Sequence, residues 1–483
     1  MSGNKNKLVL GVDSSTQSTK VEIRDLQTGA VVAHSSAKHP PTTPPVSEQD
    51  PNAWWQALSS CFSDVKEHLP HVVGVSIAGQ QHGLVMLDES GQPLRPAKLW
   101  NDTTSAPQSE ALIKKLGASR WVEGCGSLPG AAFTVCKLAW VAEHEPELMD
   151  RVAYIGLPHD YLTWRLTGQW TSDRGDASGS GWWSPSSNEY QPDLLAAVNG
   201  NLMDCVPKVL GPKDIAGHVS LDDFAFTADT VVGSGSGDNM GAAMGLGLKP
   251  GDVVISLGTS GTAYAVSTTA TADVSGSVAG FADATGHFLP LVCTLNATKV
   301  TDAVARLLGT DFNAFAELVM AAPSGAGGVV TVPYFDGERT PNKPDATGAI
   351  AGLRSDVSRE QLARSAVEGV CCGLLDGVDA LEQAGVTMDG QLYLIGGGAQ
   401  SKATRSVMAT IAQRSLVVPD AAETVATGAC VQAAVVYEQS DHAEVAERWS
   451  LGQGAMVEVP DTQPEDESVA DIRERYRAEA LQR

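Results

Sequence analysis

The sequence predicts an α/β fold built as two similar halves with a cleft between them. The main observation is a hairpin pattern that occurs twice, in which two apolar runs are joined by a polar tip. The runs cover 8–12 and 20–23 in the first half, and 252–257 and 263–266 in the second. Short apolar runs of this kind are typical of buried strands, and the Gly, Ser and Thr residues between them favour a turn.

A second pattern also occurs twice, as an apolar run that leads into a Gly-rich turn. The run 72–77 leads into 78–83, and the run 392–395 leads into 396–401. Glycine after a strand is common where the chain turns towards a helix. Because each half contains both patterns in the same order, we predict a duplicated architecture.

A helix of small residues is predicted near the end of each half, at 240–248 and at 427–436. Small side chains let two helices approach closely, as a domain interface would require, although ordinary core helices are the alternative. Lys249, Pro250 and Gly251 mark the boundary, so we predict domains at 1–248 and 249–483. After 458 the tail is polar, and from Val469 we expect a short exposed helix.

The charge balance limits the possible partners. The 483 residues include 33 Lys and Arg against 57 Asp and Glu, a formal net charge of −24. The negative electrostatic field of such a charge repels nucleic acid and anionic membranes, so we expect neither as a partner. The chain has no apolar run long enough to span a membrane or act as a signal peptide, and its eight cysteines form no C-x-x-C pair. We therefore expect a cytoplasmic protein with reduced thiols and without a zinc site.

Asp238 is the candidate catalytic residue. It follows Gly235, Ser236 and Gly237 and precedes a predicted helix of small residues. One interpretation is an N-cap, because Asp before a helix accepts backbone N–H bonds. The other is a general base, which the positive end of the helix would keep ionised by lowering its pKa.

The polar hairpin tips and the second Gly-rich turn are candidates for nucleotide binding. Their backbone N–H groups and hydroxyls suit a polyphosphate such as that of ATP, although such residues are also ordinary turn formers. The chain contains no Walker motif. The candidate contacts are Ser14, Thr16, Gln17, Gly258, Thr259, Gly397, Gly398, Ala399 and Ser401.

Asp13, at the first tip, is either a partner of the Mg²⁺ that accompanies ATP, directly or through water, or the first residue of an Asx turn. The candidate acceptor residues lie in two polar clusters of the first half, each after an apolar run. Amide and carboxylate groups beside an indole suit a sugar, although a lone His or Trp is more often structural. These candidates are Gln81, His82, Trp100, Asn101 and Asp102.

Longer motifs resemble the FGGY family of carbohydrate kinases, within the actin and hexokinase-like superfamily. The residues 348–353 and 361–368 are similar to the family's C-terminal signature, and 134–140 to most of its first signature. Further segments resemble family members in the same order, so that the resemblance covers nearly the whole chain. They are 79–84, 99–102, 157–162, 176–179 and 237–239.

The resemblance implies two ribonuclease-H-like domains with an interdomain cleft, and transfer of phosphate from MgATP to the terminal hydroxyl of a sugar. It gives Asp238 the position of the catalytic base, and Gln81, His82 and Asn239 the positions of sugar contacts. Thr104 and Thr404 depart from the family, which often has Arg and Trp there.

The acceptor favoured by the resemblance is D-xylulose, with ribulose, L-xylulose or glycerol as alternatives. A homodimer is a candidate assembly. From another class, an actin-like or chaperone-like ATP-gated interaction protein would show slow ATPase activity that is indifferent to sugars. A sugar sensor without catalysis would not need Asp238.

Overall fold

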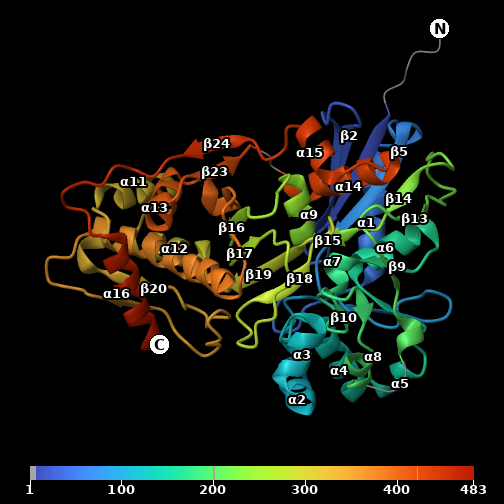
Figure 1. Cartoon of the computed structure of the whole chain (residues 1–483), viewed down its shortest axis with the longest axis horizontal. Helices are drawn as coiled ribbons and strands as arrows, with labels where there is room; N and C mark the ends of the chain where they lie inside the picture. Colours follow the sequence, from blue (N-terminus) through green and yellow to red (C-terminus); the bar gives the residue numbers. More distant parts are fainter. Residues whose placement is uncertain (1–6, 199–201, 421–422) are drawn as a thin grey trace, which may run out of the picture. The chain divides into compact units, whose positions relative to one another are not determined.

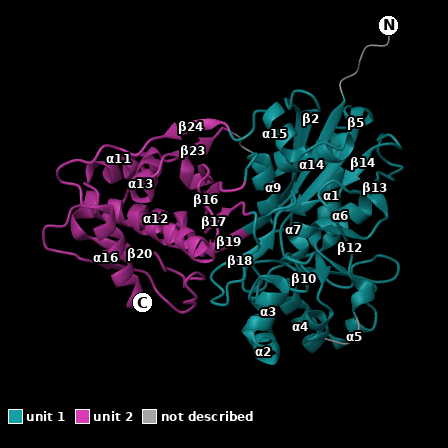
Figure 2. Ribbon diagram, in the orientation of Figure 1, with its two compact units in different colours: residues 1–249, 268–289, 421–452 teal, residues 250–267, 290–420, 453–483 magenta. Residues whose placement is uncertain are grey.

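The computed structural model describes residues 7–198, 202–420 and 423–483, and the chain divides into two compact units. Figure 2 shows the units in different colours. Unit 1 comprises 1–249, 268–289 and 421–452, and unit 2 comprises 250–267, 290–420 and 453–483. The first segment of unit 1 ends beside the predicted boundary, but two later segments return to this unit. Within the described residues, no helix is long and apolar enough to cross a bilayer.

Unit 1 contains the first half of the chain and two later segments (Figure 1). Its strands are β1 (Leu8–Ser14), β2 (Ser18–Asp25), β3 (Val31–Lys38), β4 (Glu48–Gln49), β5 (Val72–Gly79), β6 (Val85–Leu87), β7 (Ala97–Lys98), β8 (Tyr154–Gly156), β9 (Thr171–Asp173), β10 (Trp183–Ser184), β11 (Glu189–Tyr190), β12 (Lys208–Leu210), β13 (Ile215–His218), β14 (Val231–Gly233), β15 (Ser236–Gly237) and β18 (Ala279–Ala282). Its helices are α1 (Pro51–Asp64), α2 (Ala106–Leu116), α3 (Ala118–Cys125), α4 (Thr134–His144), α5 (Pro146–Met149), α6 (Pro158–Thr167), α7 (Arg174–Ala177), α8 (Pro192–Ala196), α9 (Asp238–Gly245), α14 (Thr424–Glu438), α15 (His442–Arg448) and the 3₁₀ turns η1 (Leu69–His71) and η2 (Met203–Cys205).

The main sheet of unit 1 has the strand order β13-β14-β5-β1-β2-β3, with β15 also paired to β5. Strands β1 and β15 both run parallel to β5, with Asp13 opposite Ala78 and Gly237 opposite Gly79. The carboxyl ends of these three strands therefore meet at one edge of the sheet. This edge brings together Asp13, the turn after Gly79, and Asp238.

Alternate residues of the sheet face two layers of helices. Leu10 and Val12 pack into a core with Trp54 of α1 and Leu162 of α6, whereas Val9 faces Cys430 of α14 and its neighbours. This alternation follows from the two-residue period of a strand. The predicted first hairpin and the strand 72–77 are thus confirmed as β1, β2 and β5.

The two helices of small residues, α9 and α14, pack against each other within unit 1. A Cβ at Gly245 would overlap the carbonyl of Thr424, and one at Gly428 would overlap the carbonyl of Gly241. Glycine is therefore required for this close approach. The predicted close packing of these helices is present, but α14 belongs to unit 1 and not to the second half of the chain.

Unit 2 repeats the central motif of unit 1. Its elements are β16 (Val253–Leu257), β17 (Gly261–Ala265), β19 (Phe288–Thr294), α10 (Thr298–Leu308), α11 (Phe312–Ala321), η3 (Ala326–Gly328), β20 (Val330–Val332), β21 (Ala349–Ala351), α12 (Arg359–Gln383), β22 (Leu392–Ile395), η4 (Gly397–Gln400), α13 (Lys402–Ala412), β23 (Leu416–Pro419), β24 (Gly454–Val457) and α16 (Val469–Leu481). The hairpin β16–β17 is antiparallel and β22 runs parallel to β16, as β5 does to β1. The duplicated α/β architecture predicted from the sequence is confirmed.

The C-terminal tail forms the predicted helix, α16, but the expectation that this helix is exposed was wrong. Ile472, Tyr476 and Ala480 are buried, because they lie four residues apart on one helical face. The Arg473 and Arg477 side chains form ion pairs with Asp376 and Asp379 of α12. The tail is thus part of unit 2.

Candidate active site

Asp238 is the first residue of α9. The N-cap is Gly237, in an extended conformation, so the prediction that Asp238 is the cap was wrong. The Asp238 Oδ1 atom accepts hydrogen bonds from the backbone N–H of Asn239 at 2.8 Å and from its side-chain amide at 3.0 Å. The same amide donates to Gln81 Oε1 at 2.8 Å. Gln81, Asn239 and Asp238 therefore form one hydrogen-bonded group.

The predicted lowering of the Asp238 pKa was also wrong. Burial raises the pKa of Asp238 to about 6, and this effect outweighs the hydrogen bonds from Asn239 that favour the charged form. Desolvation disfavours a carboxylate more strongly here than the helix terminus stabilises it. With a pKa near 6 the carboxyl is still mostly ionised at neutral pH and is well matched to accept a proton.

Asp13 lies at the end of β1, beside the turn that follows β5. Burial, followed by the charge of Asp238, raises its pKa to about 7. Its Oδ1 atom is buried and has no hydrogen-bond partner among the described residues. An orphaned carboxylate oxygen of this kind suits a cation or a water bound to it. The described residues contain no cluster of three or more His, Cys, Asp or Glu suited to a metal.

The first hairpin tip is tied to the turn after β5. Thr16 Oγ1 donates to Gln80 Oε1 at 2.9 Å and accepts from the indole of Trp100 at 3.0 Å. Ser14 is buried within β1, 3.4 Å from the Thr19 hydroxyl, whereas Gln17 is exposed. Thr16 is therefore the tip residue that is joined to the predicted acceptor clusters.

The acceptor candidates differ in accessibility. Trp100 is 40% exposed, whereas Gln81, His82 and Asp102 are buried. Gln81 Nε2 and Asn101 Oδ1 are buried atoms that lack a partner among the described residues. Asp102 has no exposed surface, and its carboxylate accepts hydrogen bonds from the backbone of Ser47 and from the backbone and hydroxyl of Thr104. The prediction of a direct sugar contact by Asp102 does not fit this burial.

His82 adopts a left-handed conformation, with φ of 64°. Its Nδ1 atom lies 3.0 Å from the carbonyl oxygen of Gly179, and its ring stacks on Phe133 with centroids 5.1 Å apart. A Cβ at Gly179 would lie 2.5 Å from the imidazole. Gly179 belongs to the segment 176–179, which resembles a segment of the family. This segment therefore fixes the His82 ring.

A buried ionic cluster lies beside the turn that precedes Asp238, and the sequence had not indicated it. His159 Nε2 is 3.2 Å from both Asp160 and Asp173 and 3.4 Å from Asp176, and all four side chains are almost fully buried. Burial alone would lower the His159 pKa, but the charge of Asp160 and its neighbours raises it to about 9. A Cβ at Gly235 would meet the His159 ring at 2.5 Å. The imidazolium thus supports the turn that carries Asp238.

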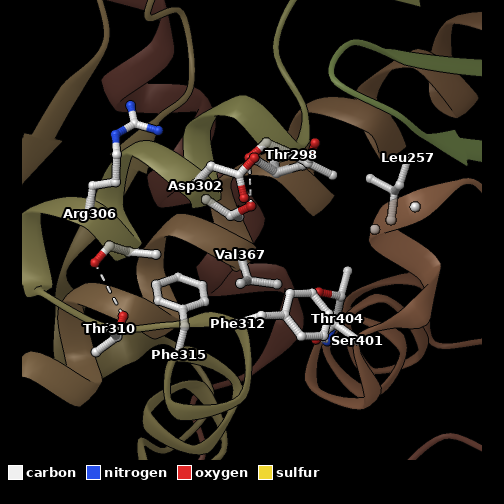
Figure 3. Close-up of a pocket in the computed structure, with 15 residues that line it drawn as sticks. Leu257, Thr298, Asp302, Arg306, Thr310, Phe312, Phe315, Val367, Ser401 and Thr404 are labelled. Atoms are coloured by element: carbon white, nitrogen blue, oxygen red, sulfur yellow. Dashed lines mark hydrogen bonds between the residues drawn. The ribbon is translucent and has the colours of Figure 1, made fainter.

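The nucleotide candidates from the second half of the chain lie in unit 2, where a cavity of 520 Å³ opens beside η4 (Figure 3). Gly397, Gly398 and Ser401 line it, whereas Gly258, Thr259 and Ala399 do not. Gly258 and Thr259 form the β16–β17 tip and accept hydrogen bonds from Thr298 and Ala297 at 3.0 and 3.1 Å. Cavities of this size hold small ligands in many proteins.

Most of the cavity wall was not predicted from the sequence. Phe312 and Phe315 of α11 present their rings to it, and Arg306 and Asp302 come from α10 (Figure 3). Phe312 is 58% exposed, so its ring is accessible from the cavity. Thr404, noted as a departure from the family, also lines the cavity. The mixture of rings, hydroxyls and one guanidinium suits a nucleoside with an anionic group.

Comparisons with known proteins identify the family. The model of the FGGY carbohydrate kinase N-terminal domain matches residues 8–245, and that of the C-terminal domain matches 253–437. A xylulose kinase from Streptomyces rubiginosus is 46% identical over 460 residues, covering 95% of this chain and 94% of the relative. One from Escherichia coli is 35% identical over 424 residues, with 85% and 86% covered.

Solved structures give the same result. The crystal structure of xylulose kinase from Bifidobacterium adolescentis has a TM-score of 0.85 and 39% identity, and covers 98% of this chain and 99% of its own. The glycerol kinase of Plasmodium falciparum with ADP shares the fold, with a TM-score of 0.85 at 20% identity over 99% and 97% of the two chains. The chain belongs to the FGGY family of carbohydrate kinases and is a sugar kinase with the family's two-domain α/β fold.

Proposed function

We propose that this kinase transfers the terminal phosphoryl group of ATP directly to D-xylulose, giving D-xylulose 5-phosphate. FGGY kinases use ATP as the phosphate donor. The xylulose kinases of Streptomyces and Escherichia coli support the choice of sugar, because they are similar along most of this chain. The hydroxyl at the end of the sugar is the nucleophile.

Asp238 is the general base in this proposal. The observation that carries it is the group formed by Gln81, Asn239 and Asp238, in which the Asn239 amide joins the other two side chains. Oδ1 is occupied by Asn239, and Asp238 remains half-buried at the start of α9. Phosphoryl transfer requires alignment and an acceptor for the hydroxyl proton more than covalent chemistry. Asp238, with a pKa near 6, accepts that proton at neutral pH.

The acceptor is bound by groups with unused hydrogen-bonding capacity. Gln81 Nε2 and Asn101 Oδ1 are buried without hydrogen-bond partners among the described residues. An unsatisfied buried polar atom costs free energy unless a ligand supplies its hydrogen-bond partner. The exposed ring of Trp100 offers an apolar face for the C–H side of a sugar. His82 is held in place by Gly179 and Phe133 and borders the same turn.

The nucleotide is assigned to the cavity of unit 2, with Gly397, Gly398 and Ser401 beside its phosphates and the Phe312 ring available to the base. Mg²⁺ fits the orphaned Oδ1 of Asp13, because this ion uses one or two carboxylates together with water and phosphate oxygens. When bound, Mg²⁺ supplies neutralisation of phosphate charge.

A panel of sugars tests the acceptor. Purified protein is given ATP and D-xylulose, ribulose, L-xylulose or glycerol, and ADP is measured in a coupled assay. We expect the highest kcat/KM for D-xylulose. A tenfold preference for another acceptor would contradict the choice of sugar, and sugar-independent ATP hydrolysis would contradict the transfer itself.

A further inference from the structure

Lys98 is almost completely buried, and a buried ammonium group needs partners. It is 1% exposed, and its Nζ atom lies 3.3 Å from each carboxylate oxygen of Asp102 and 3.1 Å from Glu48 Oε1. It also donates to Thr104 Oγ1 at 2.7 Å and lies 3.9 Å from the centroid of the Trp140 ring. These groups surround the Lys98 ammonium, which therefore links strand β7 to the loop that follows it.

Asp102 lies in the middle of the loop 99–105, which joins β7 to α2. It has no exposed surface, and its Oδ2 accepts from the backbone N–H of Ser47 at 2.8 Å. Oδ1 accepts from the backbone and the hydroxyl of Thr104, at 3.0 and 2.5 Å. Burial alone would raise its pKa, but these hydrogen bonds and the charge of Lys98 outweigh burial and lower it. Asp102 therefore holds the loop as a fixed anion.

The loop is tied through this network to the tip of the first hairpin. Strand β4 pairs with β7, with Glu48 opposite Lys98. The next residue, Gln49, donates its side-chain amide to the carbonyl of Thr16 at 2.8 Å. From the loop itself, the Trp100 indole donates to Thr16 Oγ1 at 3.0 Å. Two routes thus connect the loop to one residue of the tip.

We propose that Lys98 and Asp102 are positioning residues for the sugar acceptor. Their ion pair fixes Trp100, whose ring is exposed, and Asn101, whose Oδ1 lacks a partner among the described residues, against the first hairpin tip. Thr104 lies between the two charges and completes the pair. In this way the cation that the loop needs comes from strand β7, four residues before Asp102.

The inference rests on the proposed function only in its choice of the loop as an acceptor site. It predicts that damage to the ion pair changes the binding of the sugar more than the binding of ATP or the phosphoryl transfer. A misplacement of binding groups by about 1 Å costs as much as about 10²-fold in rate or affinity. An ion pair with a purely structural role would change stability alone.

The test compares Lys98→Met, Asp102→Asn and the double variant with the wild type. The KM for the sugar, the KM for ATP, kcat and the melting temperature are measured for each, with the acceptor that the wild type phosphorylates best. We expect the sugar KM to rise by at least about tenfold in all three, with the ATP KM changed less than about threefold. Because the double variant leaves no unpaired charge, it keeps the test decisive if a single variant does not fold.

A second buried ion pair with the same spacing serves as the matched control. Arg364 and Glu368 of α12 lie four residues apart with 2.7 Å between Nε and Oε1, and both are almost fully buried. The variant Arg364→Met with Glu368→Gln should lower the melting temperature and leave the sugar KM unchanged. An unchanged sugar KM in the Lys98 and Asp102 variants, or an equal rise in the control, would overturn the proposal. A wild type without activity on D-xylulose but active on another sugar would contradict only the proposed acceptor.

Discussion

Asp13 and Asp238 interact across the sheet edge of unit 1: the charge of Asp238 adds to burial in raising the pKa of the Asp13 carboxyl to about 7. Asp13 lies near the end of β1 and Asp238 directly follows β15, and both strands pair with β5 and run parallel to it. Two nearby carboxyls with shifted pKa values are typical of sites that divide their roles between them. Here Asp13 is the proposed partner of a cation and Asp238 the proposed base.

The activity should fall as the pH falls through about 6. Asp238, whose pKa is raised to about 6, must be ionised to accept a proton, so kcat decreases on the acidic side. Asn239→Ala removes a hydrogen bond that favours the charged form, and should move this limb of the profile to higher pH. The measurement is kcat at saturating substrates between about pH 5 and 8. A flat profile over this range would contradict the assignment.

Asp13→Asn should increase the requirement for Mg²⁺. The substitution removes the carboxylate that the proposal assigns to the ion, while the amide keeps the shape of the side chain. We expect the Mg²⁺ concentration for half-maximal activity to rise by about 10- to 100-fold at fixed ATP. Removal of Mg²⁺ with a chelator should abolish activity in the wild type. An unchanged Mg²⁺ dependence in the variant would contradict a role of Asp13 with the metal.

Two neighbouring glycines should respond differently to substitution by alanine. No described atom lies within 4 Å of a Cβ at Gly397, whereas one at Gly398 would be 2.9 Å from both Leu257 and Thr298. Gly397→Ala should therefore fold normally but raise the KM for ATP, because its methyl group occupies cavity space. Gly398→Ala should lower the melting temperature. The nucleotide assignment would be contradicted by an unchanged ATP KM in Gly397→Ala.

His159→Asn should destabilise the protein and should make its free energy of unfolding depend less on pH in the alkaline range. The folded pKa of His159 is raised from 6.5 to about 9, so its stabilisation is present at neutral pH and is lost as the pH rises through 9. Removing this cation leaves three buried carboxyls, a loss of about 3–5 kcal/mol in the free energy of unfolding. Urea unfolding at two pH values measures both effects, with exposed His34→Asn as the control. Equal stability of the variant and the wild type would show that the cluster needs no cation.

Local patterns predicted the repeated parts of the fold. The hairpins β1–β2 and β16–β17, and the strands that lead into glycine turns, depend on short apolar runs and on residues that favour turns. The sequence also predicts that Asp238 lies at the start of a helix, although it does not distinguish the N-cap from the first helical residue. Both positions have the same residue types nearby, and only the backbone angles separate them.

Features that depend on distant contacts were not predicted. The sequence predicts a sugar contact at Asp102, because its local pattern does not reveal the hydrogen bond from the backbone of Ser47, 55 residues away, to the buried carboxylate. The lowered pKa expected for Asp238 ignored burial, which only the packed structure reveals. The docking of α16 did have a signal, since Ile472, Tyr476 and Ala480 repeat every four residues.

Asp238→Asn tests the central claim most directly. Asparagine keeps an oxygen that accepts hydrogen bonds from Asn239, and the substitution removes a carboxylate that burial disfavours, so melting should be normal or slightly higher. The variant cannot take the hydroxyl proton at neutral pH, and kcat should fall by about 10² to 10⁴. A well-folded variant with this loss would support the proposed base, whereas normal turnover by the same variant would contradict it.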